Sequence, residues 1–182
     1  MRIIAGKFKG RSLESVPDIS VRPATGRVKG AIFNMLQNRL GLINATVLDL
    51  FAGSGSLGFE ALSRGASAVV FVDESRPVLE SIRSNAQTLG CLDMCDIIHD
   101  DAVSFVGHCR DRFDLIFADP PYAYAETPML PMVVFQHKLL KSGGFLIIEH
   151  AKQTTFSPSE YYKLAVQKQF GNTQVSFFQH HE

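Results

Sequence analysis

An aspartate followed by two prolines and an aromatic residue closes one of the most apolar segments of the chain. Asp119, Pro120, Pro121 and Tyr122 come directly after Phe113–Ala118, a run with the character of a strand. The two prolines stiffen the turn and carry no N–H donors, so a backbone carbonyl near Pro120 stays available as an acceptor. The Asp119 carboxylate and this carbonyl can hold both N–H groups of an exocyclic amine, while the Tyr122 ring stacks on the base. The segment therefore predicts a catalytic site for transfer to an amino nitrogen.

The chemistry of such an amine explains why these residue types would occur together. Its lone pair is delocalised into the ring, which makes the nitrogen a poor nucleophile. Two acceptors that hold both N–H groups draw the nitrogen toward tetrahedral geometry and direct its lone pair at an electrophile. The motif is compatible with adenine N6, cytosine N4, guanine N2 and a protein glutamine amide. Taken alone, it is also compatible with a proline-rich turn that has no chemical role.

A second candidate site is a glycine-rich loop after the apolar run that ends at Phe51. Gly53, Gly55 and Gly58 have the spacing G-x-G-x-x-G between a predicted strand and a predicted helix. Glycine lets backbone N–H groups come close to a ligand. Dinucleotide-binding folds show the same pattern with an acid about 20 residues further on, and Asp73 stands at that position here. The glycines alone therefore fit NAD and S-adenosylmethionine equally.

The position of Asp49 favours S-adenosylmethionine. It lies inside the predicted strand just before the loop, where a carboxylate would repel a pyrophosphate but attract a sulfonium and an ammonium group. Asp73 is expected to accept hydrogen bonds from the ribose hydroxyls, and Asp101 to meet the adenine ring. A helix cap is the alternative role for these acids; it carries equal weight for Asp101 and is not expected for Asp49 within a strand. The predicted cofactor-binding residues are Asp49, Phe51, Ala52, Gly53, Gly55, Asp73, Glu74, Asp101 and Ala102.

Apolar segments of strand and helix length alternate along the chain and would place both motifs at strand ends. The predicted strands are Val47–Phe51, Ala68–Asp73, Asp96–His99, Phe113–Ala118 and Gly144–Glu149. The predicted helices between them are Leu57–Arg64, Arg76–Leu89, Ala102–Cys109 and Met129–Leu140. This alternation predicts a parallel sheet covered by helices on both faces. Residues Tyr161–Lys168 and Gln174–Gln179 predict a final antiparallel hairpin.

The N-terminal part has a different pattern. Arg2–Ala5 and Ser12–Val16 predict a small hairpin around the turn Gly6–Gly10, and a helix follows from about Gly26 to Leu40, which Thr25 could cap. The chain thus predicts an α/β fold, a Rossmann-like class I S-adenosylmethionine-dependent methyltransferase. Its mostly parallel seven-stranded sheet would end in the C-terminal antiparallel hairpin and carry a small N-terminal β-hairpin and helix.

Composition fits a single compact protein: of 182 residues, 46% are hydrophobic and 20% charged. The N-terminus lacks the apolar region of a signal peptide, and the longest apolar runs are too short to span a bilayer. Three cysteines, Cys91, Cys95 and Cys109, suit a reducing compartment, and without a second ligand pair no metal site is expected. We therefore expect a cytoplasmic protein with no membrane contact.

Charge is unevenly distributed along this neutral chain. The first 30 residues hold seven basic side chains against the acids Glu14 and Asp18, which gives +5 there and leaves −5 in the remainder. The basic residues are Arg2, Lys7, Lys9, Arg11, Arg22, Arg27 and Lys29. Such asymmetry predicts an N-terminal segment that binds an anionic partner. A mildly basic, solvated surface is the alternative.

Nearly the whole chain resembles the RsmD-type 16S rRNA (guanine-N2)-methyltransferases. The resemblance is carried by Arg2–Arg11, Arg22–Leu36, the Asp49 loop, Asp119–Tyr122, Leu140–His150 and Phe170–Thr173. It implies methylation of one guanine of 16S rRNA within the small ribosomal subunit or its assembly intermediates, by an enzyme expected to be a monomer. It divides the chain into an RNA-contacting extension, residues 1–40, and a methyltransferase domain, residues 41–182. Gly26 and Gly30 depart from the family pattern, which has an acidic and a charged residue there.

The resemblance also implies which residues touch RNA and frame the pocket. These are Arg2, Lys7, Lys9, Arg11, Arg22, Thr25 and Arg27. Specificity would then come from RNA shape and from a base splayed out of its stack.

Four other functions remain open on sequence grounds. The chain could methylate adenine N6 in DNA, although 182 residues leave no room for a separate target-recognition domain. It could methylate a protein glutamine, which the basic N-terminal segment argues against. It could also be a non-catalytic RNA-binding assembly factor with this fold, for which Asp119–Tyr122 would be unnecessary, or an NAD enzyme.

Overall fold

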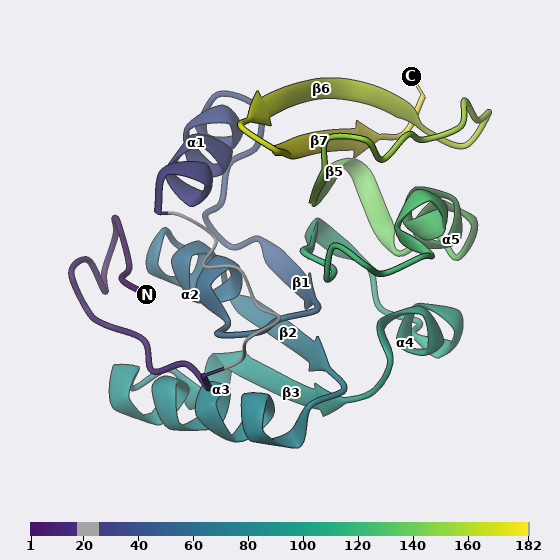
Figure 1. Ribbon diagram of the computed structural model, residues 1–182. Helices are drawn as coiled ribbons and strands as arrows, with labels where there is room; N and C mark the ends of the chain where they lie inside the picture. Colours follow the sequence, from purple (N-terminus) through teal and green to yellow (C-terminus); the bar gives the residue numbers. More distant parts are fainter. Residues whose placement is uncertain (18–25, 182) are drawn as a thin grey trace.

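A computed structural model describes residues 1–17 and 26–181. Seven strands form one sheet in the order β3-β2-β1-β4-β5-β7-β6 (Figure 1). Their bounds are β1 Thr46–Leu50, β2 Ala68–Asp73, β3 Cys95–His99, β4 Phe113–Ala118, β5 Leu140–Ala151, β6 Lys163–Phe170 and β7 Thr173–Gln179. The first five strands pair in parallel, whereas β7 is antiparallel to both β5 and β6. The predicted parallel sheet with a C-terminal antiparallel hairpin is therefore confirmed.

Helices cover both faces of this sheet (Figure 1). They are α1 Gly26–Gln37, α2 Ser56–Ser63, α3 Arg76–Leu89, α4 Ala102–His108 and α5 Leu130–Gln136, with the short 3-10 turns η1 Leu92–Met94 and η2 Thr127–Met129. One apolar cluster joins α1, α2 and α3 to strand residues such as Phe117 and Ile147. A second joins α4 and α5 to Ile116 and Ile148. Because side chains of a strand alternate between faces, the central strands β1, β2 and β4 contribute to both cores and form nearly continuous apolar runs.

The predicted boundary between the last helix and the strand that follows it differs from the structure. The helix expected to reach Leu140 ends at Gln136, and Leu140 begins β5. Lys138 has a φ of 58°, in the left-handed region that stops a helix. Leu139 and Leu140 are buried in the core below α5, so tertiary packing, which the apolar spacing alone does not reveal, decides their conformation.

The predicted N-terminal hairpin is reduced to a single antiparallel bridge between Arg2 and Ser12. The regular strands expected there are absent from residues 1–17, because part of the backbone pairs with α2 instead. The N–H groups of Ile4 and Ala5 donate to the Glu60 carboxylate at 2.8 and 3.0 Å, and that of Lys7 donates to the Ser63 carbonyl at 2.7 Å. The N-terminal segment is thus docked on α2. The predicted Thr25 cap of α1 lies outside the described residues.

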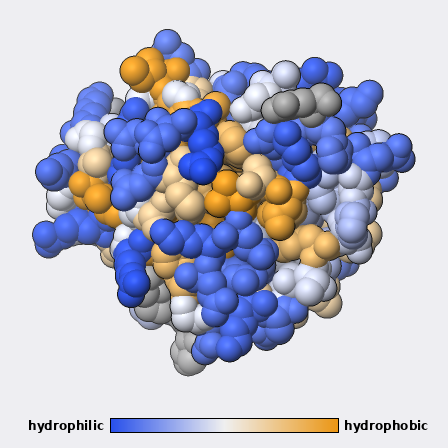
Figure 2. All heavy atoms as spheres, turned by 90° about the horizontal axis from the view of Figure 1, so that it is seen from above, coloured by the Kyte–Doolittle hydropathy of each residue, from blue (hydrophilic) through white to orange (hydrophobic). Residues whose placement is uncertain are grey.

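The edge strand β6 exposes the apolar Leu164 and Ala165 as well as the polar Gln167, Lys168 and Gln169. Figure 2, which views the molecule from above, shows apolar groups gathered at the centre of a largely hydrophilic face.

Among the described residues, no helix has the length and apolar character needed to cross a membrane.

Candidate active site

Both sequence motifs lie at the carboxyl edge of the sheet, at the point where the strand order reverses. From β1 the chain continues to β2 and β3 on one side, and then returns to β4 and β5 on the other. Ligands of open α/β sheets bind in the crevice at such a switch point. Leu50 pairs with Ala118, so Phe51 and Asp119, the next residue of each chain segment, emerge side by side. The glycine loop and the aspartate–proline segment therefore face the same crevice.

Asp49 is buried on the β1 side of this crevice, with an exposed fraction of 2%. Its Oδ2 accepts the N–H of Gly58, in the first turn of α2, at 3.0 Å. Burial raises the pKa of the Asp49 carboxyl to about 8, Gly58 opposes the shift, and Asp73 adds to it. The expectation that a strand residue would not cap a helix was wrong, because β1 ends directly beneath the start of α2. Asp49 thus both fixes the loop and offers a cation a buried carboxyl.

The three glycines of the loop have different tasks. A Cβ at Gly58 would lie 2.3 Å from the Phe71 ring, and one at Gly55 would lie 2.8 Å from the Phe59 ring. These two glycines allow α2 to pack closely on the core. A Cβ at Gly53 would meet only the Phe51 carbonyl, at 3.9 Å, so this glycine borders open space. The sequence predicts that all three glycines let the backbone come close to a ligand; among them, only Gly53 has the open space for this role.

Two more acids of the predicted cofactor site, Asp73 and Asp101, organise backbone turns. Asp73, at the end of β2, accepts the N–H of Gly53 at 3.0 Å with Oδ2 and that of Ser75 at 2.9 Å with Oδ1. A carboxylate has about four acceptor positions, so Asp73 can still bind hydroxyl groups. Asp101 caps α4 by accepting the N–H of Ser104 at 2.8 Å. The cap alternative is thus realised for Asp101, and its contact with adenine stays a prediction.

The remaining predicted cofactor residues surround the same turns. Ala52 is buried and donates its N–H to the Val72 carbonyl at 3.1 Å, Ala102 is buried at the start of α4, and Glu74 is exposed. Phe51 adopts a φ of 56°, which is rare for a bulky residue and is typical of functional turns.

Sequence reasoning missed Tyr124, whose ring packs edge-on against Phe51 with centroids 5.0 Å apart. Burial raises the pKa of the Tyr124 phenol to about 12, and the nearby carboxylates of Asp101, Glu126 and Glu74 add to the shift. Tyr124 therefore lies close to Phe51, Asp101 and Glu74, which are among the predicted cofactor-binding residues. The only signal in the sequence was a second aromatic residue two positions after Tyr122.

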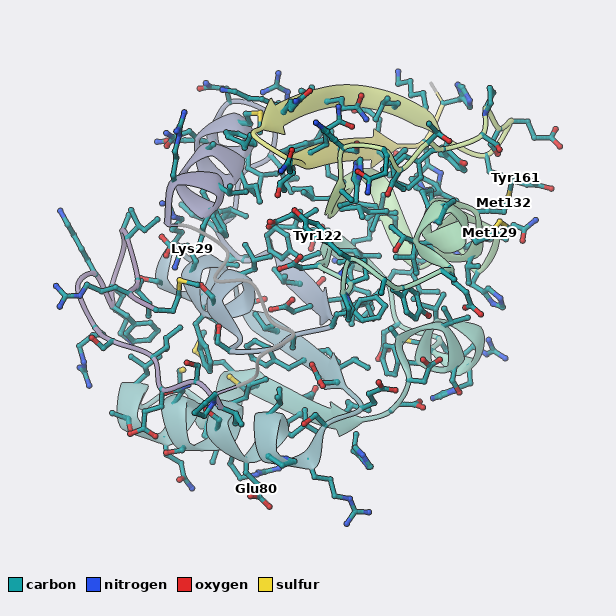
Figure 3. The ribbon with its side chains drawn as sticks, viewed as in Figure 1. Lys29, Glu80, Tyr122, Met129, Met132 and Tyr161 are labelled. Atoms are coloured by element: carbon teal, nitrogen blue, oxygen red, sulfur yellow. The ribbon has the colours of Figure 1, made fainter. Side chains whose placement is uncertain are left out.

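The aspartate–proline segment lies on the β4 side of the crevice. Asp119 is half-buried, Pro120 is buried, and Pro121 and Tyr122 are exposed. The Tyr122 hydroxyl is hydrogen-bonded to the Thr173 hydroxyl of β7. Figure 3 shows Tyr122 near the centre of the molecule, between β7 and β1. A shallow hollow beside it is lined by Pro120, Pro121, Tyr122, Thr127, His150, Ala151 and Thr154.

A second residue missed by sequence reasoning is Glu149, a carboxylate with an exposed fraction of 4% near the end of β5. Ala118 pairs with Ile148, which makes Asp119 and Glu149 the following residues of the two neighbouring strands. An acid inside an apolar strand is an unusual feature, and it was the available signal.

The described basic residues proposed for RNA, Arg2, Lys7, Lys9, Arg11 and Arg27, are all exposed. Arg22 and Thr25 lie outside the described residues. Lys29, which was counted among the seven cations of the N-terminal segment, is 1% exposed and cannot contact phosphate. Its Nζ donates to the Arg2 carbonyl at 2.7 Å and to the Ser56 hydroxyl at 2.9 Å, and lies 3.4 Å from Glu60. Figure 3 places it between α1 and α2.

Comparison with known proteins agrees with this geometry. The family model Conserved hypothetical protein 95 matches residues 1–179. The chain is 32% identical over 182 residues to the Ribosomal RNA small subunit methyltransferase D of Haemophilus influenzae, which covers 98% of this chain and 93% of that protein. It is 35% identical over 122 residues to the protein of the same name from Escherichia coli K12, covering 67% and 60%.

Solved structures give the same result. The Escherichia coli protein yhhF superposes with a TM-score of 0.86 at 28% identity, covering 99% of this chain and 97% of that one. SMU.776, solved in complex with SAH, shares the fold with a TM-score of 0.69 at 16% identity, covering 94% and 52%. Because the family model spans almost the entire chain and a relative covered over nearly its full length exceeds 30% identity, the chain belongs to the RsmD-type family described as Conserved hypothetical protein 95 and is a methyltransferase.

Proposed function

We propose that this protein methylates the exocyclic N2 amine of one guanine in the 16S rRNA of the small ribosomal subunit. The observation that carries the proposal is the placement of Asp49 and Asp119 on the two sides of one switch-point crevice, at the ends of paired strands. The relatives named as small-subunit rRNA methyltransferases support the RNA substrate.

The residues around the crevice fit S-adenosylmethionine. The open space at Gly53 lets the loop backbone approach a ligand, and the buried Asp49 carboxyl suits a sulfonium or an ammonium group. When bound there, the cofactor supplies a methyl group on a positively charged sulfur. Asp73 is assigned to the ribose hydroxyls, and Phe51 and Tyr124 to the adenine side of the crevice.

Asp119 and the Pro120 carbonyl are assigned to the two N–H groups of the target amine. They would orient the nitrogen lone pair toward the methyl group that the bound cofactor would supply. The Asp119 carboxylate would accept the proton that the nitrogen loses when it is methylated. Tyr122 stacks on the base, and its bond to Thr173 fixes the ring. Most of the rate enhancement assigned to these residues is orientation.

Residues 1–40 are proposed as the RNA-contacting extension and residues 41–182 as the methyltransferase domain. Arg2, Lys7, Lys9 and Arg27 offer exposed cations that can neutralise phosphates and make binding sensitive to salt. Arg11 also donates to the Thr88 carbonyl of α3 at 3.0 Å, which ties the extension to the domain. We propose that the protein acts as a monomer in the cytoplasm, on the rRNA of the subunit or of its assembly intermediates.

Isotopic methyl transfer tests this proposal. Wild-type protein is incubated with labelled S-adenosylmethionine and either deproteinised small-subunit rRNA, assembled subunits, plasmid DNA or a release factor. Label is expected in rRNA or subunits, and it is expected to disappear with Asp119→Ala. Asp114→Ala is the matched control, because Asp114 lies at the opposite end of the same strand, where it binds Lys141 at 2.8 Å. Label in DNA alone, or equal counts from wild type and Asp119→Ala, would refute the proposal.

A further inference from the structure

The candidate active site contains one buried carboxylate to which the transfer reaction assigns no task. Glu149 is 4% exposed and lies in β5, where Ile148 pairs with Ala118 of β4. The next residues along these two strands are Glu149 and Asp119. Neighbouring strands are about 4.8 Å apart, so the two acidic side chains start from adjacent positions at the carboxyl edge of the sheet.

Both side chains project from the same face of the sheet. Phe117 and Ile147 belong to the apolar cluster beneath α1, α2 and α3. Asp119 and Glu149 come two residues after them, and strand side chains alternate with a period of two. Asp49 is related in the same way to Val47, which belongs to the same cluster. The three carboxyl groups therefore line one side of the sheet, above its core.

The Tyr122 ring is held in place close to Glu149. In the antiparallel pair of β5 and β7, Glu149 lies opposite Val175, and Ala151 lies opposite Thr173. The Tyr122 hydroxyl is bonded to that threonine. The ring that is proposed to stack on the base is thus held two residues along β7 from the partner of Glu149. A base placed against Tyr122 with its amine at Asp119 would present the adjoining part of its edge to Glu149.

The amino bases differ in whether the ring nitrogen beside the amine donates or accepts a hydrogen bond. In guanine, the exocyclic amine at C2 has N3, an acceptor, on one side and N1–H, a donor, on its Watson–Crick side. In adenine and cytosine, the ring nitrogen next to the amine carries a lone pair and accepts. A carboxylate accepts hydrogen bonds but cannot donate them when ionised. A carboxylate at this position attracts guanine and repels the two other amino bases.

We propose that Glu149 selects guanine by accepting its N1–H, while Asp119 and the Pro120 carbonyl hold the N2 amine. This inference rests on the proposed function and adds the specificity that the aspartate–proline segment lacks, because Asp119–Tyr122 would serve any amino group. It also gives a task to a buried acid that directly follows the apolar residues Phe145–Ile148 of β5.

The test compares guanine with 2-aminopurine, which keeps the amine at C2 but has an acceptor at N1. Small subunits are reconstituted with rRNA that carries either base at the nucleotide that wild type methylates, as mapped by mass spectrometry. Wild type is expected to prefer guanine by about 100-fold or more in kcat/KM, since a site built around a substrate N–H rejects an analogue without it. Glu149→Gln is expected to reduce the preference to about tenfold or less, because its amide can turn and donate to N1.

Two further variants separate this role from a structural one. Glu149→Asp keeps an acceptor and is expected to keep the preference at a lower kcat/KM. Glu60→Gln alters a buried carboxylate outside the site and is expected to leave the preference unchanged even where the protein is less stable.

The outcomes distinguish the two claims. If wild type methylates guanine and Glu149→Gln retains its full preference over 2-aminopurine, with S-adenosylhomocysteine binding intact, Glu149 does not read the base and only the present inference fails. If wild type methylates no guanine in any subunit or rRNA, the proposed function itself fails, and the inference fails with it.

Discussion

The buried carboxyl of Asp49 makes cofactor affinity depend on pH in a way that can be calculated. Burial raises its pKa to about 8, so at pH 7 roughly one molecule in ten has Asp49 ionised before the ligand binds. A ligand that carries a positive charge beside Asp49 requires the ionised form. Ionisation costs about 1.4 kcal/mol at pH 7 and about 2.7 kcal/mol at pH 6, since each pH unit below the pKa adds about 1.36 kcal/mol.

S-Adenosylmethionine affinity is therefore expected to rise about tenfold per pH unit from pH 5.5 to 7.5. This range stays below most of the titration of the ligand's own α-amino group, near pH 7.7–8.0 for α-amino groups in general. Titration calorimetry in buffers with different ionisation enthalpies measures the affinity and the protons released, about 0.9 per site at pH 7. Affinity that is flat with pH, together with no proton release, would refute the reasoning.

Asp49→Asn is the matched variant, because the amide oxygen of Asn can still accept the Gly58 N–H. It is expected to bind S-adenosylmethionine more weakly, with no proton release. Its effect on stability has the opposite sign. Since the folded-state pKa of Asp49 lies above the ordinary value, the folded protein holds more protons than the unfolded chain between about pH 4 and pH 8, and stability falls as pH rises through this window. Asp49→Asn is thus expected to melt higher than wild type at pH 8; a large loss of stability would assign Asp49 a purely structural role.

Substitutions at three positions test the packing around the site and the N-terminal segment. Tyr122→Phe keeps the ring but loses the hydrogen bond to Thr173, so kcat/KM should fall by less than about tenfold. Tyr122→Ala also loses base stacking worth about 1–3 kcal/mol. Equal losses of kcat/KM for the two variants in methyl-transfer assays would contradict a stacking role. Glu60→Gln breaks a buried ion pair with Lys29 and should lower the free energy of unfolding in urea by about 3–5 kcal/mol, and an unchanged midpoint would show that the N-terminal segment is not held there. Gly30→Ala should raise the free energy of unfolding by about 0.5–1 kcal/mol, because alanine is favoured over glycine inside a helix such as α1. The new Cβ has room there, since it would lie 3.7 Å from the Ile4 side chain. A destabilised variant would contradict the packing described.

The periodicity of apolar residues was sufficient to predict the sheet, the helices and the final hairpin. Double-sided burial leaves continuous apolar strands, and residues such as Asp73 and Gly90 mark where elements end. The errors occurred where long-range contacts decide the structure. The N-terminal hairpin lost its regular strands because Glu60, 55 or more residues away in sequence, takes the N–H groups of Ile4 and Ala5.

The same limit applies to the site. Sequence placed Asp49 and Asp119 at strand ends because local pattern marks them. It did not show that Asp49 would cap α2, that Lys29 would turn inward to Glu60, or that Glu149 would stand beside Asp119. These relations depend on strand order and register, which bring together residues far apart in the chain.

Nucleoside mass spectrometry of small-subunit rRNA from a strain that lacks this protein measures directly whether it methylates 16S rRNA. We expect the loss of one N2-methylguanosine from 16S rRNA, restored by the wild-type gene and not by Asp119→Ala. An unchanged set of modified nucleosides in the 16S rRNA of that strain would contradict it.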